Sequence, residues 1–183
     1  MRILKWIGLV LLAIAIGFFQ ERLKVSINFT IEKGDSIEHF YEMSANERIA
    51  ALSQIKTNNP FDYYQSHESV NALNHLSRQQ LKMTKWLITV IFVVVFFLLN
   101  RLALWWIFNS PTLIKWLATT YIVAFCGALL IYSGGYIFGR SDLFYAVSRK
   151  MVGALQSPIP AMMNWAGWIL YLRNSKFAHE KDK

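Results

Sequence analysis

Histidine and cysteine are the side chains of this sequence best suited to catalysis or metal binding, and both are scarce. The histidines are His39, His67, His75 and His179, and none lies within an apolar run. In a helix, His67 and His75 would share one face with Asn71. A metal ion needs a third ligand, and no cysteine or acidic residue stands at ligand spacing on that face. We therefore interpret the face as a solvated polar stripe and expect no metal site.

The single cysteine, Cys126, lies inside an apolar run, where a nucleophilic role would require Arg140 to support an oxyanion. The reactive form of cysteine is the thiolate, which hydrocarbon disfavours, and no histidine lies at that depth to accept its proton. We expect a packing cysteine. The sequence also contains no Ser/His/Asp set, no paired carboxylates in an apolar run, no glycine-rich phosphate loop and no CxxC motif. This pattern predicts a non-enzymatic protein that uses no cofactor.

Polar residues within the apolar runs are candidates for a transport site, because ionisable groups at membrane depth often mark ion or substrate paths. They are Arg101, Arg149, Lys150 and Asn164. No inverted repeat or filter-like loop accompanies them, and the nearest carboxylate, Asp142, stands at the edge of a run. For Arg149 and Lys150 we favour an amphipathic helix at the membrane surface over a substrate site. A small oligomeric channel or transporter subunit is the alternative function.

The longest apolar run, Trp86–Phe108, is the element around which these residues must be arranged. It contains 23 residues, and its first strongly polar side chain is Asn100. A hydrocarbon core of about 30 Å requires about 20 apolar residues in a helix, because lipid offers the backbone no other hydrogen-bond partner. Tryptophans near both ends suit the membrane interfaces, and Arg101 is close enough to the end to extend to the headgroups. The run therefore predicts a transmembrane helix.

A second span is predicted at 116–138, after a tight turn at Asn109-Ser110-Pro111. It is rich in small residues, and Gly135 and Gly139 have the four-residue spacing that lets helices approach closely. This spacing is common by chance. We favour ordinary packing within a helical bundle over a dedicated dimer surface.

Composition agrees with a membrane protein. Of the 183 residues, 55% are hydrophobic and only 16% are charged, and the mean hydropathy is +0.30. The net charge of +8 does not come from residues 20–85, where eight basic and eight acidic residues cancel. The surplus lies at the chain ends and beside the apolar runs, as the positive-inside rule predicts, so we expect no nucleic-acid binding.

Residues 1–19 begin with Arg2 and Lys5 and continue as an apolar run. A cleaved signal peptide is the alternative, with Ala13-Ile14-Ala15 as the cleavage site. Cleavage there would leave an apolar new terminus after a very short apolar core, so we favour an uncleaved transmembrane anchor. With its basic start in the cytoplasm, the chain then emerges on the exoplasmic side.

Residues 20–85 form the only sizeable polar segment and are predicted to be a small exoplasmic insert of helices with one short strand. Apolar and polar residues alternate over Val25–Ile31, which indicates a half-buried strand. After a turn, a helix is expected over Ser36–Ile55, with a restart where Ser44 and Glu47 have capping-box spacing.

A second, long helix is expected over 62–108, with a capping signal at Asp62 and with its first half outside the membrane. A segment of this size has a small core. The insert is therefore expected to rest on the bilayer, on another copy of the chain or on a partner.

The last membrane segment, 143–172, is too long for one straight crossing. Ser157-Pro158-Ile159-Pro160 interrupts it, because Pro158 lacks a backbone donor and Ile159 precedes another proline. We expect a half-helix that lies at the interface or enters the membrane, a bend, a final helix to Leu172, and a basic cytoplasmic tail at 173–183. The result is about four crossings with both termini inside, and only Arg140, Arg149 and Lys150 do not fit the charge rule.

In its plan, the chain resembles the small membrane proteins associated with exosortase systems of Bacteroidetes, the X-type or F-type accessory proteins. The likeness is carried by a short anchor that ends in GFFQERLKV, a polar insert, a closely spaced helical pair, Phe144-Tyr145, the basic pair Arg149-Lys150 and Pro158. It covers the two ends of the chain better than the insert. The longer insert fits the X-type better, and the basic pair stands further from Tyr145 than in the F-type.

The resemblance implies a protein of the bacterial inner membrane that assists a membrane cysteine peptidase or transpeptidase in sorting surface proteins. It does not imply the peptidase itself, because no histidine lies at membrane depth. The sequence thus predicts an all-α, multi-pass accessory protein with a membrane domain at 86–183. Its expected partners are the lipid bilayer, an exosortase-like membrane protein and a further copy of itself. The expected contact residues are Gly135, Gly139, Arg140, Phe144, Tyr145, Arg149, Lys150 and Pro158.

Overall fold

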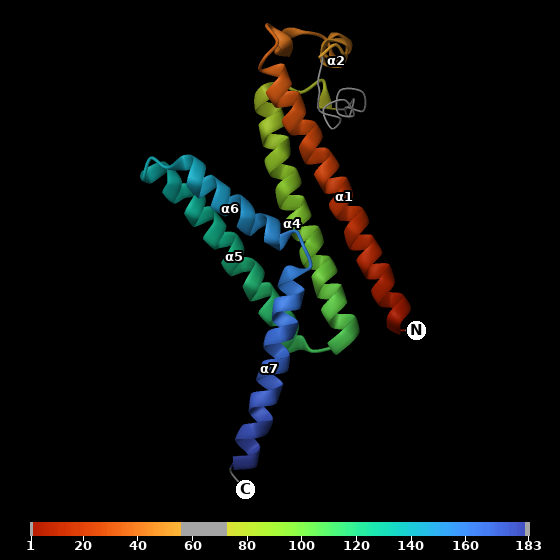
Figure 1. The fold of residues 1–183 in the computed structure, drawn as a ribbon, viewed down its shortest axis with the longest axis vertical. Coiled ribbons are helices and arrows are strands. Elements are labelled where there is room, and N and C mark those ends of the chain that lie inside the picture. Colours follow the sequence, from red (N-terminus) through yellow and green to blue (C-terminus); the bar gives the residue numbers. More distant parts are fainter. Residues whose placement is uncertain (1, 56–72, 182–183) are drawn as a thin grey trace. The chain divides into compact units, whose positions relative to one another are not determined.

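The computed structural model describes residues 2–55 and 73–181, and every regular element in this part of the chain is helical (Figure 1). Two compact units can be distinguished: the insert unit, residues 16–91, and the C-terminal unit, residues 1–15 together with 92–183. The elements are α1 (Arg2–Gly34), the short 3-10 helix η1 (Phe40–Glu42), α2 (Ala45–Ser53), α4 (Arg78–Phe108), α5 (Pro111–Ile137), α6 (Ser141–Leu155) and α7 (Ile159–Lys181).

The strand predicted over Val25–Ile31 is wrong, because these residues continue α1 as far as Gly34. Two of the three polar members of the alternating pattern, Ser26 and Thr30, are buried beside Ile27 instead of facing water, and the third, Asn28, is half-buried. Residues four apart share one helix face. The Thr30 hydroxyl donates to the Ser26 carbonyl oxygen at 2.9 Å, so it is satisfied inside its own helix.

The helix predicted over Ser36–Ile55 is wrong in its first half, where a turn and η1 precede α2. His39 has a φ of 54°, a left-handed conformation that interrupts an α-helix. The restart at Ser44 is confirmed. Its hydroxyl accepts from the Glu47 amide at 3.4 Å, and the Glu47 carboxylate accepts from the Ser44 amide at 2.8 Å. This reciprocal pair satisfies two orphan donors of the first turn of α2.

The long helix predicted over 62–108 begins later than expected, at Arg78. Ser77 and Gln80 form a second reciprocal cap, with amide-to-side-chain distances of 2.8 and 3.3 Å, which fixes the start of α4. Residues 62–72, with the capping signal at Asp62, lie outside the described residues. From Arg78 the helix runs without a break into the apolar run and ends at Phe108.

Both breaks predicted in the C-terminal unit are confirmed. Asn109 has a φ of 45°, and Ser110 caps α5 by accepting from the Leu113 amide at 3.4 Å. The second break is the bend at residues 156–158, between the end of α6 and the start of α7. The final helix does not end at Leu172 as predicted; α7 continues to Lys181, and no glycine or proline stands between these two residues.

Among the residues that the structure describes, two helices are long and apolar enough to cross a membrane, α4 and the Pro111–Gly135 part of α5. The core helix of a soluble protein has the same length and composition, but it is mostly buried. Here only 28% of the apolar window of α4 and 17% of that of α5 are buried inside the protein. Large apolar side chains therefore lie on the surface of both helices, including Leu87, Val94, Leu98, Ile122, Val123 and Leu130.

Candidate contact site in the C-terminal unit

Helices α5 and α6 form an antiparallel hairpin, and the short turn 138–140 joins them (Figure 1). Near the turn, a Cβ atom added to Gly134 would lie 3.7 Å from the Phe144 ring. Further along, the Ser148 hydroxyl donates to the Ala128 carbonyl oxygen at 2.8 Å. Small residues on α5 thus let α6 approach closely, since a larger side chain would hold the helices apart.

The two glycines predicted as a helix-contact pair do not share a helix surface. Gly135 is buried within α5. Gly139 lies in the turn beyond the end of α5, with a φ of +64°, and a Cβ atom there would meet nothing within 4 Å. Its role is conformational, because L side chains rarely adopt this φ. The close approach of α5 and α6 occurs instead at Gly134 and Gly127, which the sequence analysis did not single out.

The other predicted contact residues lie along α6 and the turns at its two ends. The Phe144 ring stacks on Phe138 with centroids 6.2 Å apart, and Tyr145 makes an edge contact with Tyr132 at the same distance. The charged members and the proline of the set are all exposed: Arg140, Arg149, Lys150 and Pro158. The aromatic pair therefore holds the hairpin together, and the basic residues face away from it.

The bend between α6 and α7 is closed by two buried polar side chains that the sequence analysis did not identify as partners. Helix ends leave carbonyl groups without intrahelical donors. The Tyr121 hydroxyl donates to the Leu155 carbonyl oxygen at 2.8 Å, and Asn100 Nδ2 donates to the Ser157 carbonyl oxygen at 2.9 Å. Asn100 also donates to the Tyr121 hydroxyl oxygen at 2.8 Å. The only signal in the sequence was one asparagine in the run 86–108 and one of the three tyrosines in the run 116–138.

Asn164, a candidate for a transport site, is committed to packing between α5 and α7. Its Nδ2 atom donates to the Pro160 carbonyl oxygen at 2.7 Å and to the Thr120 hydroxyl at 3.2 Å. The side chain is 8% exposed. Both amide hydrogens are therefore used within the bundle, and the geometry gives Asn164 a structural role.

Aromatic rings gather where α4 ends and α5 begins. Trp116 makes edge contacts with Trp168 at 5.6 Å and Tyr171 at 5.7 Å, and Trp168 and Tyr171 are stacked at 5.5 Å. Phe108 and Trp165 add a tilted pair at 6.3 Å. Tryptophan and tyrosine favour the level of the lipid headgroups. This cluster is where a membrane interface would be expected.

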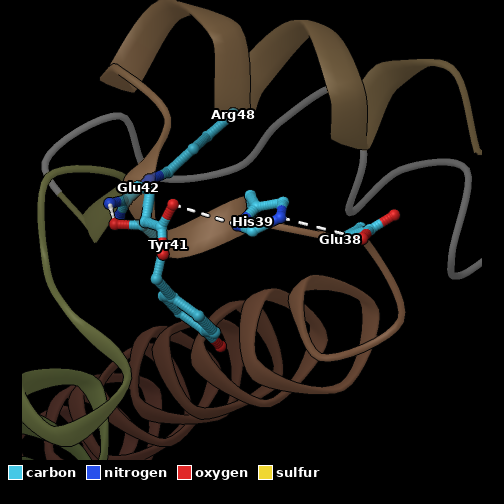
Figure 2. Close-up of polar contacts among 5 residues, drawn as sticks. All are labelled: Glu38, His39, Tyr41, Glu42 and Arg48. Carbon is cyan, nitrogen blue, oxygen red and sulfur yellow. Dashed lines mark hydrogen bonds and ion pairs between the residues drawn. The ribbon is translucent and has the colours of Figure 1, made fainter.

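The insert unit has a polar centre of its own, built on Arg48 of α2. Figure 2 shows its side chain reaching from α2 to the turn of Tyr41 and Glu42. The guanidinium donates to the carbonyl oxygens of Tyr41, Met43, Asn74 and Leu76 at 2.5 to 3.0 Å, and Arg48 is 6% exposed. Arginine can occupy such a site because its planar fork carries five donors. The Arg48 guanidinium thus supplies hydrogen-bond donors to the carbonyl groups of two segments outside the α-helices, residues 41–43 and 74–76.

Tyr41 and Asp35 connect this centre to the start of α4. The Tyr41 hydroxyl donates to Asp35 Oδ1 at 3.3 Å, and Arg78 pairs with Asp35 Oδ2 at 2.6 Å. Burial, and then the negative charge of Asp35, raise the pKa of Tyr41 to about 12. The ion pair between Arg78 and Asp35 is partly exposed to solvent, so it contributes little to the stability of the unit on its own.

His39 lies between two carboxylates on the surface of the same unit, as Figure 2 shows. Its Nδ1 atom lies 3.0 Å from Glu42 and its Nε2 atom 3.7 Å from Glu38, and all three side chains are exposed.

Of the residues considered above for metal binding, His67 lies outside the described residues. In the part of the chain that the structure describes, no three His, Cys, Asp or Glu side chains are grouped so that they could hold a metal ion. Cys126 is exposed on α5.

Comparison of the chain with protein families, with curated proteins and with solved structures finds no match in any of the three.

Proposed function

We propose that this chain is a multi-pass protein of the bacterial inner membrane, with both termini in the cytoplasm, that acts by protein–protein contact and not by catalysis. The observation that carries the membrane location is the exposure of α4 and α5, whose apolar windows are only 28% and 17% buried. Such a surface is stable in hydrocarbon and unfavourable in water.

We assign the fourth crossing to α6 and α7 together, in place of the surface position that the sequence favoured for the helix of Arg149 and Lys150. Helix α6 starts at the end of α5 and runs back along it, and α7 brings Trp168 to Trp116 near the other end of α5. The pair therefore traverses the length of α5, with the bend inside the bundle. Broken helices occur at membrane depth only where other groups satisfy the freed backbone, which Asn100 and Tyr121 do here.

The partner we propose is an exosortase-type protein that sorts surface proteins. The support for it is the resemblance of the anchor, the Phe144-Tyr145 pair, the basic pair and Pro158 to the accessory proteins of such systems. The insert would present its surface to the partner on the exoplasmic side, with Arg48 keeping that surface in one conformation.

The experiment is crosslinking from single photoreactive positions on the exposed surface of the insert, at Glu38 and Glu42, in native membranes. Mass spectrometry then identifies what is attached. The matched control is a photoreactive residue at Ile37, which packs against the core of the insert unit. The proposal predicts an exosortase-like membrane protein at Glu38 or Glu42 and not at Ile37. Recovery of lipid alone from all positions would contradict it.

A second measurement separates contact from transport. The purified chain, reconstituted alone in liposomes, should produce neither solute leak nor ionic current. A conductance that Arg149→Ala changes would favour the oligomeric channel or transporter subunit instead.

A further inference from the structure

Arg149 and Lys150 lie near the middle of the membrane segment that α5 defines. In the sequence they stand between Ser148 and Met151, and both of these residues contact the middle of α5. The Ser148 hydroxyl donates to the Ala128 carbonyl oxygen, and the Met151 Cε atom lies 3.4 Å from the Cβ position of Gly127. From the aromatic cluster at Trp116 to the end of α5 a helix rises about 30 Å, and Gly127 is about 15 Å from either end. This distance exceeds the length of an extended lysine or arginine side chain.

Both cations face away from the hairpin, and among the described residues of the C-terminal unit no carboxylate lies at their depth. They are exposed, while Ser148 and Leu155 on the opposite side of α6 are buried. Asp142 is the only acidic residue between positions 69 and 179, and it stands at the start of α6. The same helices of a second copy, α4 to α7, therefore bring no carboxylate to that level either.

A cation in hydrocarbon is unfavourable unless a counter-charge or water reaches it. The outward face of α6 also permits close approach. A helix turns about 100° per residue, so Ala146 and Gly153 fall on one line between the directions of Arg149 and Lys150. A Cβ atom added to Gly153 would meet nothing within 4 Å. Arg149 and Lys150 thus lie on either side of two small residues, Ala146 and Gly153, against which another helix can pack closely.

We propose that the outward face of α6 binds a membrane-spanning helix of a different protein, and that this helix carries a carboxylate near the middle of the bilayer, between Arg149 and Lys150. The inference rests on the proposed membrane location, and it names the chemistry of the partner. The carboxylate offsets one of the two positive charges and so makes burial of the cations less unfavourable, while the small residues Ala146 and Gly153 let the two backbones approach closely.

The test uses the full chain in phosphatidylcholine vesicles with a leucine-rich transmembrane peptide as the probe. One peptide carries a central aspartate, and the matched peptides carry asparagine or leucine there. Association is measured by energy transfer between a donor on the chain and an acceptor on the peptide. The aspartate peptide should associate on the order of tenfold more strongly than the leucine peptide, and more strongly than the asparagine peptide.

Two pairs of variants locate the effect. The double variant Arg149→Leu, Lys150→Leu should abolish the preference for aspartate, whereas Arg101→Leu, which removes a cation from α4, should not. Gly153→Leu should weaken association of the aspartate peptide, whereas Gly167→Leu on α7 should leave it unchanged. Because the peptide series requires no change to the chain, the test stands even where a variant fails to fold.

Equal association of the aspartate and leucine peptides with the inserted chain would overturn the inference. So would an aspartate preference that survives the double variant. A third contradicting result is loss of the preference when phosphatidylglycerol is added, with enrichment of that lipid around the chain; lipid headgroups would then be the counter-charge. Insertion is scored separately by flotation of the vesicles, and a chain that does not float with them refutes the proposed membrane location instead.

Discussion

The two units of this protein solve the same problem with different chemistry. In the insert unit, a charged side chain, Arg48, donates to backbone carbonyls where the chain leaves regular structure. In the C-terminal unit, the bend between α6 and α7 is closed by neutral donors, Asn100 and Tyr121. A guanidinium buried in hydrocarbon would carry a large desolvation penalty, and that of a hydrogen-bonded amide or phenol is much smaller. The difference is the one expected if water surrounds the insert unit and hydrocarbon surrounds the C-terminal unit, as proposed above.

Replacement of Arg48 should have the strongest effect. Arg48→Met leaves four buried or half-buried carbonyl groups without donors, so the insert unit should lose about 3 kcal/mol of unfolding free energy or more. Hydrogen exchange of residues 40–43 and 73–76 is the measurement. Arg78→Met, which removes an exposed ion pair, is the control and should change exchange little. Equal changes in exchange rate for Arg48→Met and Arg78→Met would contradict the role given to Arg48 in the insert unit.

The neutral donors of the bend should contribute less per residue. Asn100→Leu and Tyr121→Phe should each lower stability in detergent by about 1 kcal/mol, the range measured for polar contacts between membrane helices. Since the two side chains bond to each other, the double variant should lose less than the sum. Thermal unfolding measures all three. Thr119→Val, at an exposed hydroxyl that bonds within its own helix, should be neutral.

The turn between α5 and α6 uses a third device, a glycine in place of a side-chain donor. Gly139→Ala should cost about 1 kcal/mol, because an alanine at a φ of +64° is strained although space is free around it. Gly139→Asn should cost less. Gly167→Ala tests space without strain, in a regular helix with nothing near the added methyl, and should be neutral or slightly stabilising.

The smallest effect concerns pH and should be confined to the insert unit. The folded state raises the pKa of Tyr41 to about 12, so it favours the neutral phenol. The stabilisation is fully present below the ordinary tyrosine pKa of about 10 and is lost as the pH rises toward 12. The free energy of unfolding of the insert unit, obtained from exchange rates corrected for the base-catalysed chemical rate, should fall over this range, and Tyr41→Phe should flatten the change. An unchanged pH profile in Tyr41→Phe would show that Tyr41 does not cause it.

Local signals predicted the parts of the fold that local chemistry decides. The cap at Ser44 with Glu47, the turn at Asn109-Ser110-Pro111 and the bend at Pro158 each depend on a few neighbouring residues, and all are confirmed. Apolar runs likewise predicted α4 and α5 because a helix that long and that apolar has few alternatives.

Predictions failed where distant parts of the chain decide the outcome. The alternating pattern before Ile31 indicated a strand, because the sequence does not show that Ser26 and Thr30 are buried in a helix that satisfies the threonine hydroxyl internally. Asn100 and Ser157 are 57 positions apart, so no local pattern links them. Gly139 was paired with Gly135 by spacing alone, but the helix ends between them.

The membrane location can be tested by washing membranes from cells that express the chain with alkaline carbonate and then extracting them with detergent. If hydrocarbon covers the exposed faces of α4 and α5, the chain stays in the membrane pellet through the wash and enters solution only with detergent. A chain that remains dispersed in the carbonate supernatant would contradict the proposed membrane location.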